Sequence, residues 1–213
     1  LTVITGVSGS GKTTLVLESL IPALENHIAG KELPQHVKNV CAEEIKHVKL
    51  IDATPIGINV RSTVATYANV HDELRKVFAK TSAAKEFGYK AGDFSYNTGT
   101  LRCPTCDGTG SISLDVQFLP DVDVPCPDCR GARYSREAEK IKYISKSGEA
   151  YSLPEIMAMD INQALAACKD LDIFRQRLQG LKGLGLGYLT PGEAAPGLYG
   201  GGGRGLTFAS ELV

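Results

Sequence analysis

Long apolar runs are missing from this sequence of 213 residues. No stretch reaches the roughly eighteen consecutive apolar residues of a membrane-spanning helix, and the first residues lack the features of a secretory signal. We therefore expect an intracellular, cytoplasmic protein with no membrane contact. A large charge of either sign is missing too. The formal net charge is -1, so any contact with nucleic acid must come from a local patch.

Metal-ligand spacing is missing from the four histidines, which we interpret as ordinary surface or core residues. Four of the six cysteines, by contrast, lie in two close pairs with the pattern C-x2-C-x19-C-x2-C. This spacing is typical of tetrahedral Zn²⁺, and four thiolates leave no open position for a water molecule. We therefore predict a structural zinc site. Its ligands are Cys103, Cys106, Cys126 and Cys129.

A glycine-rich pattern, GxxxxGK[ST], lies between an apolar run at residues 1–4, which predicts a buried strand, and a predicted helix over residues 13–20. In this context it indicates a phosphate-binding loop, whose backbone N–H groups converge on phosphate oxygens. Lys12 would contact the β- and γ-phosphates, and the Thr13 hydroxyl would bind Mg²⁺. The predicted residues for binding ATP or ADP are Gly6, Val7, Ser8, Gly9, Ser10, Gly11, Lys12, Thr13 and Thr14.

A phosphoryl-transfer site also needs an acidic residue at the end of a buried strand. Asp52 follows the apolar-rich residues 48–51 but matches this requirement weakly. We expect the catalytic carboxylates to lie beyond residue 213, in a longer protein of which this chain is a piece. The catalytic residues therefore stay unassigned, and we expect the piece to bind nucleotide better than it hydrolyses it.

Local patterns predict several further elements. Alternation of apolar and polar residues over 112–118 predicts a strand, and residues 72–80 are expected to be helical. Two capping boxes, Ser152 with Glu155 and Asp160 with Gln163, each predict the start of a helix.

A basic segment follows the last cysteine. Residues 130–146 contain six basic and two acidic residues, a net charge of +4, interleaved with two tyrosines. Such a segment is a candidate for phosphate contacts with DNA, and equally for an ordinary solvated face. The candidate DNA-binding residues are Arg130, Arg133, Arg136, Lys140 and Lys142.

Several short motifs, in their order along the chain, resemble the UvrA family of the bacterial excinuclease. The resemblance is greatest to the C-terminal of the family's two ATP-binding-cassette halves. The motifs are the loop at residues 5–14, Pro55-Ile56-Gly57, Ala65-Thr66-Tyr67, the cysteines with Phe118-Leu119-Pro120-Asp121-Val122, and Gly185-Leu186-Gly187-Tyr188.

The resemblance implies a dimeric ATPase that uses ATP, Mg²⁺ and Zn²⁺, scans double-stranded DNA for lesions, and loads the partner UvrB to start nucleotide excision repair. In the position of the family's signature, this chain has Leu198-Tyr199-Gly200-Gly201-Gly202, of which Gly200 and Gly201 match. Tyr199 replaces a small hydroxyl residue and Gly202 replaces a carboxylate, so the signature is degenerate. Ala53 replaces the glutamine of the family's Q-loop.

The expected fold is therefore an α/β P-loop ATP-binding-cassette core, incomplete, with an inserted β-rich zinc module and a helical signature region. The expected domains are residues 1–91 for the ATP-binding core, 92–146 for the zinc module, and 147–213 for the signature region, truncated before Walker B. Alternative interpretations are a stand-alone P-loop kinase with a zinc-stabilised lid and Asp52 as its acidic residue, a UvrA-like resistance ATPase, and a chaperone-type zinc module.

Overall fold

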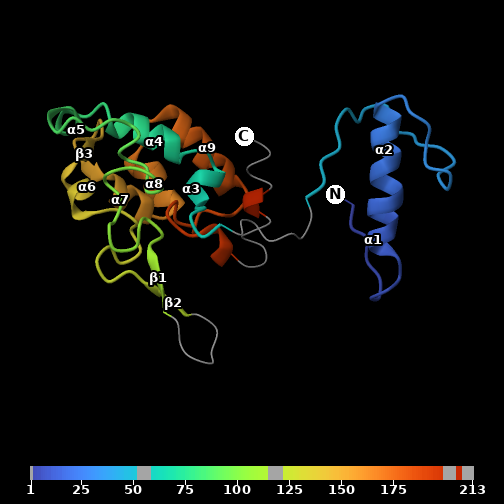
Figure 1. Ribbon diagram of the computed structural model, residues 1–213. Helices are drawn as coiled ribbons and strands as arrows, with labels where there is room; N and C mark the ends of the chain where they lie inside the picture. The colour runs from blue at the N-terminus through green and yellow to red at the C-terminus, as the bar shows by residue number, and fades with distance from the viewer. Residues whose placement is uncertain (1, 52–58, 115–121, 199–204, 208–213) are drawn as a thin grey trace. The chain divides into compact units, whose positions relative to one another are not determined.

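The computed structural model describes residues 2–51, 59–114, 122–198 and 205–207 (Figure 1). Contacts between residues divide the chain into two compact units, Leu1–Asp52 and Ala53–Val213. Among the described helices, none combines the length and the apolar character that crossing a bilayer requires.

The N-terminal unit contains a helical run that begins inside the glycine-rich pattern. This run confirms the helix predicted over residues 13–20, and consists of α1 (Lys12–Thr14), the π-helical η1 (Leu15–Leu20) and α2 (Ile21–Ile28). The strand predicted at residues 1–4 is wrong for residues 2–4, which have no regular structure. A strand needs a hydrogen-bonded neighbour, and residues 2–51 provide none, so Val3 stays 70% exposed.

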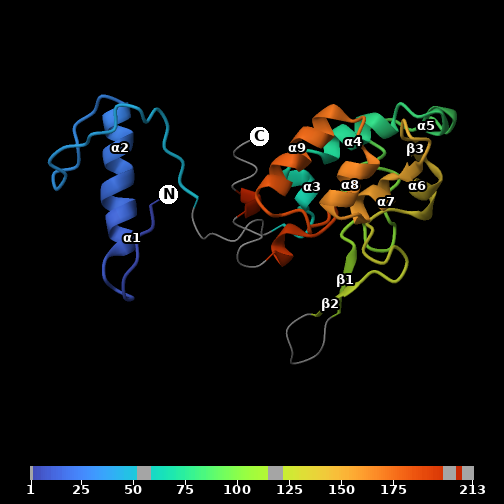
Figure 2. The ribbon, with the colours of Figure 1, turned by 180° about the vertical axis from the view of Figure 1, so that it is seen from behind.

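The C-terminal unit has a helical body. Figures 1 and 2 show α4, α8 and α9 side by side in opposite views, and α9 contacts both of the others. The helices of this unit are α3 (Val64–Tyr67), α4 (His71–Phe78), α5 (Ser82–Glu86), α6 (Arg136–Lys140), α7 (Leu153–Ala158), α8 (Ile161–Ala167), α9 (Asp172–Gly183) and the 3-10 turn η2 (Ala195–Gly197).

Capping side chains fix where several of these helices begin. The two predicted capping boxes are confirmed: Ser152 and Glu155 start α7, and Asp160 and Gln163 start α8. A third box, which the sequence analysis missed, starts α3 at Thr63. The helix predicted over residues 72–80 is α4.

One hydrophobic core joins segments that are distant in the sequence. Phe94 and Ile141, both from the predicted zinc module at residues 92–146, are fully buried in the same core as Leu74 and Leu153. The Phe94 ring lies 5.8 Å from that of Phe78. This core thus includes residues on both sides of positions 91 and 146, and the division into two units falls at residue 52.

Two antiparallel hairpins complete the C-terminal unit. In the first, β1 (Ser111–Leu114) pairs with β2 (Val122–Pro125), with Ile112 opposite Val124. In the second, β3 (Lys142–Ile144) pairs with β4 (Ala150–Ser152). The strand predicted over residues 112–118 is thus found up to Leu114, and its remainder lies outside the described residues. Figure 1 shows the first hairpin extending away from the helical body.

A second, smaller hydrophobic cluster lies at the base of the first hairpin. It consists of three buried cysteines, and the partly buried Ile112 and Cys129 pack against them. The buried cysteines are Cys103, Cys106 and Cys126. This part of the chain has little apolar surface of its own to bury, as expected of a module that a metal ion stabilises.

Candidate metal centre and phosphate loop

The fold brings the four predicted zinc ligands together. Their sulfur atoms all lie within 4.8 Å of one another, with 3.9 Å between Cys103 and Cys126 and 3.6 Å between Cys106 and Cys129. Four sulfurs in a tetrahedron around zinc, each at about 2.3 Å from the ion, are about 3.8 Å apart. The cluster is therefore compatible with zinc in its geometry as well as in its ligand type.

Glycines allow the chain to turn tightly around each cysteine pair. Gly108 follows the first pair with φ of 78°, and a Cβ added there would lie 1.7 Å from the carbonyl oxygen of Tyr96. Gly131 holds the corresponding place after the second pair, with φ of 91°. Any other residue at Gly108 would force this turn apart, so the glycine is required sterically.

A backbone N–H group points at one of the sulfurs. The N–H of Gly110 donates to Cys106 Sγ at 3.3 Å. The backbone N–H groups of Arg133 and Gly131 act on Cys129 in the direction that lowers its pKa. These hydrogen bonds stabilise thiolates, which are the form of cysteine that binds a metal ion.

Without a cation, burial opposes ionisation of these sulfurs. Burial raises the pKa of Cys103 and raises the pKa of Cys129 to about 12. Burial acts in the same direction on Cys106, but the N–H of Gly110 and the neighbouring Cys129 outweigh it and lower the pKa of Cys106. A divalent cation that binds here therefore displaces protons from at least the two thiols of raised pKa.

Two glycines of the predicted phosphate loop have left-handed backbone conformations. Gly9 and Gly11 have φ of 80° and 81°, in the left-handed region that glycine occupies without strain. The Lys12 ammonium donates to the carbonyl oxygens of Gly6 at 2.8 Å and Val7 at 2.6 Å, which holds its charge over the loop. A pocket of about 410 Å³ lies at this position. It is lined by Ser8, Gly9, Gly11, Lys12, Thr13 and Thr14.

The basic segment after the cysteines does not form a uniform surface. Arg130 and Arg136 are exposed. Lys140 forms an exposed ion pair with Glu137, one helical turn away. All three side chains are exposed to solvent, and the Lys140–Glu137 ion pair contributes little because it is exposed.

Two other members of the basic segment are engaged within the protein. Lys142 donates to both carboxylate oxygens of Glu155, at 2.8 and 2.6 Å. Burial raises the pKa of Glu155, but its hydrogen bonds with Lys142 and Ser152 outweigh this and lower it. Arg133 is only 4% exposed. We therefore leave Arg133 out of the surface that could contact DNA.

An ion-pair cluster joins the first cysteine turn to its surroundings, and sequence analysis missed it. Asp107 forms ion pairs with Arg61 at 2.8 Å and with Arg102 at 2.9 Å. Arg61 also donates to the backbone carbonyl of Asp107 at 2.7 Å. In the sequence, the only indication of this cluster is the position of Asp107 directly after Cys106. No local pattern identifies its arginine partners.

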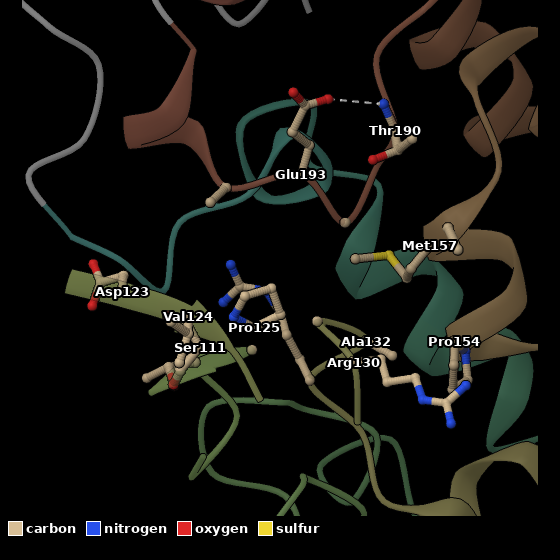
Figure 3. A pocket seen from close by; sticks show the side chains of 17 residues that line it. Ser111, Asp123, Val124, Pro125, Arg130, Ala132, Pro154, Met157, Thr190 and Glu193 are labelled. Carbon is tan, nitrogen blue, oxygen red and sulfur yellow. Dashed lines mark hydrogen bonds between the residues drawn. The ribbon is translucent and has the colours of Figure 1, made fainter. Parts of the chain in front are cut away.

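A pocket of about 530 Å³ lies between the first hairpin and the helical body (Figure 3). Ser111 and Asp123 of the hairpin line it, as do Pro154 and Met157 of α7. Arg133 is also among the lining residues. The pocket therefore separates the first hairpin from α7. The turns around the cysteines connect this hairpin to the helical body.

Some predicted site residues lie outside the described residues. These are Asp52 and Ala53, the motif Pro55-Ile56-Gly57, and Tyr199, Gly200, Gly201 and Gly202 of the degenerate signature.

Comparison with known proteins finds similar sequences. No protein-family model matches the sequence. UvrABC system protein A of Bacillus subtilis is 42% identical over 213 residues, which cover 99% of this chain. UvrABC system protein A of Synechocystis is 41% identical over 211 residues, or 98% of this chain. Over nearly its whole length, the chain is similar to a part of UvrABC system protein A.

A solved structure agrees with this similarity. UvrA2 from Deinococcus radiodurans superposes with a TM-score of 0.80 at 37% identity and covers 97% of this chain. The chain spans about a fifth of the length of its UvrA relatives, 22% for Bacillus subtilis and 21% for Synechocystis, and 24% of the UvrA2 chain.

Proposed function

We propose that this chain is the ATP-binding part of a UvrA-type ATPase that recognises DNA damage in nucleotide excision repair. The observation that carries this proposal is the similarity to UvrABC system protein A over 98 to 99% of the chain, at 41 to 42% identity. Both the glycine-rich loop and the four cysteines fall within the matched region. We further propose that it belongs to the C-terminal of the two cassette halves and that its wider fold is an ATP-binding-cassette core.

The nucleotide would bind at the glycine-rich loop. The left-handed glycines would let backbone N–H groups of the loop turn towards the phosphates, and Lys12 would supply a positive charge. The Thr13 hydroxyl would hold Mg²⁺ between the phosphates. Gly200 and Gly201 would contribute to the nucleotide site of an opposing cassette in a UvrA dimer.

DNA would contact the exposed part of the basic segment, namely Arg130, Arg136 and Lys140. The overall charge of -1 gives no long-range attraction, so these local charges would supply the phosphate contacts. Recognition of chemically different lesions would depend on the shape and deformability of the duplex rather than on base edges. The further partner in the cytoplasm would be UvrB.

The nucleotide part of the proposal is tested with Lys12→Ala. We expect ATP binding, measured by calorimetry or with a fluorescent analogue, to weaken at least about tenfold, because the charged hydrogen bonds to phosphate are lost. Lys31→Ala is the matched control, since Lys31 is an exposed lysine of the same unit. Normal ATP affinity in Lys12→Ala would contradict the assignment of the loop.

The repair proposal is tested separately from nucleotide binding. A UvrA-type protein should bind lesion-containing duplex with an affinity that falls steeply as salt rises. A stand-alone kinase should instead transfer the γ-phosphate to a small acceptor and show no such binding. Phosphate transfer to a small acceptor without duplex binding would therefore overturn the repair proposal and leave the nucleotide site intact.

A further inference from the structure

The two cysteine turns share one backbone conformation. At one position where the first turn has a glycine, the second turn has Arg133. In the first turn, Gly110 lies four residues after Cys106, with φ of 82°. In the second turn, Arg133 lies four residues after Cys129, with φ of 69°. The left-handed conformation suits glycine and is uncommon for arginine. Something beyond the turn itself must therefore favour arginine at this position.

The side chain of Arg133 crosses from the second turn to the first. A Cβ added at Gly110 would lie 3.1 Å from Arg133 Cγ, so the two turns touch here. The guanidinium donates to the carbonyl oxygens of Gly108 and Val60, each at 3.3 Å, and lies 5.3 Å from the centre of the Tyr96 ring. Arg133 thus contacts both turns and the segment that precedes α3.

The described residues contain no carboxylate that neutralises this buried charge. Arg133 is only 4% exposed, and within residues 59–114 and 122–198 no aspartate or glutamate forms an ion pair with it. Its Nε has no hydrogen-bond partner in the described part of the chain. A buried guanidinium paired only with neutral carbonyls is costly, because burial removes the water that would stabilise its charge.

The sulfurs can supply the missing negative charge. Neutral thiols offer none, but four thiolates around Zn²⁺ carry a formal charge of about -2. Burial lowers the pKa of Arg133, whereas Tyr96, Cys106 and Cys129 act in the opposite direction. The chain therefore holds a buried positive charge beside a cluster that becomes negative when the metal binds.

We infer that Arg133 is the buried counter-charge of the zinc–tetrathiolate cluster, a positioning residue that makes the two cysteine turns favour their metal-bound state. The inference rests on zinc binding by the four cysteines, as proposed above, and is independent of ATP and DNA. It predicts a specific asymmetry: loss of the guanidinium should weaken the zinc-loaded chain more than the zinc-free chain.

The test compares two arginines that differ in burial. Arg133→Met removes the buried charge, and Arg130→Met removes an exposed charge from the position directly after Cys129. Zinc affinity of the full chain is measured by competition with a chromogenic chelator. We expect Arg133→Met to bind zinc about 10- to 100-fold more weakly, as for other residues that support metal ligands. Arg130→Met should change the affinity less than about fivefold, because solvent screens its charge. Arg133→Lys, which keeps the charge, should recover part of the loss.

Thermal unfolding with and without zinc separates this role from ordinary packing. We expect the rise in melting temperature on zinc addition to be smaller in Arg133→Met than in the unmodified chain. An equal drop in melting temperature with and without zinc would overturn the inference, as would failure to fold in both conditions. Equal zinc affinities of Arg133→Met and Arg130→Met would overturn it too. An unmodified chain that binds no zinc would overturn both the inference and the proposed zinc site.

Discussion

Acidification should destabilise the C-terminal unit through one histidine. His71 is the first residue of α4 and is only 4% exposed. Its Nε2 lies 2.8 Å from the Tyr134 hydroxyl, which donates its own proton to the carbonyl oxygen of Phe94 at 3.0 Å. His71 Nε2 must then be the donor to Tyr134, which assigns the neutral Nε2–H tautomer.

The surroundings of His71 oppose a positive charge. Burial is the largest cause, followed by repulsion from Arg75, and Arg133 adds to it, whereas Asp72 acts in the opposite direction. Together they lower the pKa of His71 from 6.5 to about 4. The N-terminus of α4 disfavours a cation in the same way.

The size of the effect follows from these two pKa values. The unfolded chain binds a proton at His71 below pH 6.5, and the folded chain does so only below about pH 4. The stability contributed by neutral His71 is therefore complete above pH 6.5 and lost progressively as the pH falls towards 4. At pH 5 the loss amounts to about 2 kcal/mol, and at lower pH it approaches about 3 kcal/mol.

The assay is urea unfolding at pH 7.5 and pH 5.0, followed by circular dichroism because the sequence contains no tryptophan. His71→Gln is the comparison, since the glutamine amide cannot titrate but can still donate to Tyr134. Both proteins keep all four zinc ligands. Any destabilisation from metal loss in acid is therefore the same in both and cancels when their stabilities are subtracted. We expect the stability of the unmodified chain relative to His71→Gln to fall by about 2 kcal/mol between the two pH values. A difference that does not change with pH, or a His71 that titrates near 6.5 by NMR, would refute the reasoning.

Two further perturbations test the metal centre and the DNA surface. Cys126→Ala should release zinc, which metal analysis would show, and should destabilise the cysteine turns by on the order of 10 kcal/mol. ATP binding at the glycine-rich loop should stay unchanged. An unmodified chain that is fully stable without metal would contradict this prediction. Charge reversal at Arg130 and Arg136 should weaken duplex binding and reduce its salt slope by about 1 for each lost phosphate contact, whereas Lys182→Glu on α9 should not. Unchanged affinity across salt concentrations would leave both arginines as ordinary surface residues.

Features that depend on neighbours in the sequence could be predicted without the structure. The cysteine spacing identified four sulfurs that the fold indeed brings within 4.8 Å of one another. The capping boxes at Ser152 and Asp160 were correct because each is a contact across one helical turn. The glycine-rich pattern predicted a loop and a following helix, and both are found, since glycine conformations and helix starts are local properties.

The prediction of a strand was wrong for residues 2–4 because a strand depends on residues that are not neighbours in the sequence. An apolar run indicates that residues can be buried, but a strand forms only where another strand supplies hydrogen bonds. The hydrophobic core likewise crosses the predicted boundaries at residues 91 and 146, because Phe94 and Ile141 pack with residues far away in the sequence.

Only the tertiary structure determines which of the basic side chains are exposed to solvent. In the sequence, Arg130 and Arg133 are two similar arginines three residues apart. The fold exposes the first and buries the second among Val60, Gly108 and Tyr96, which lie 25 to 73 residues away from it. Residue type determined that a positive charge would be present, whereas burial, set by these distant contacts, determines whether that charge can meet DNA or a metal cluster.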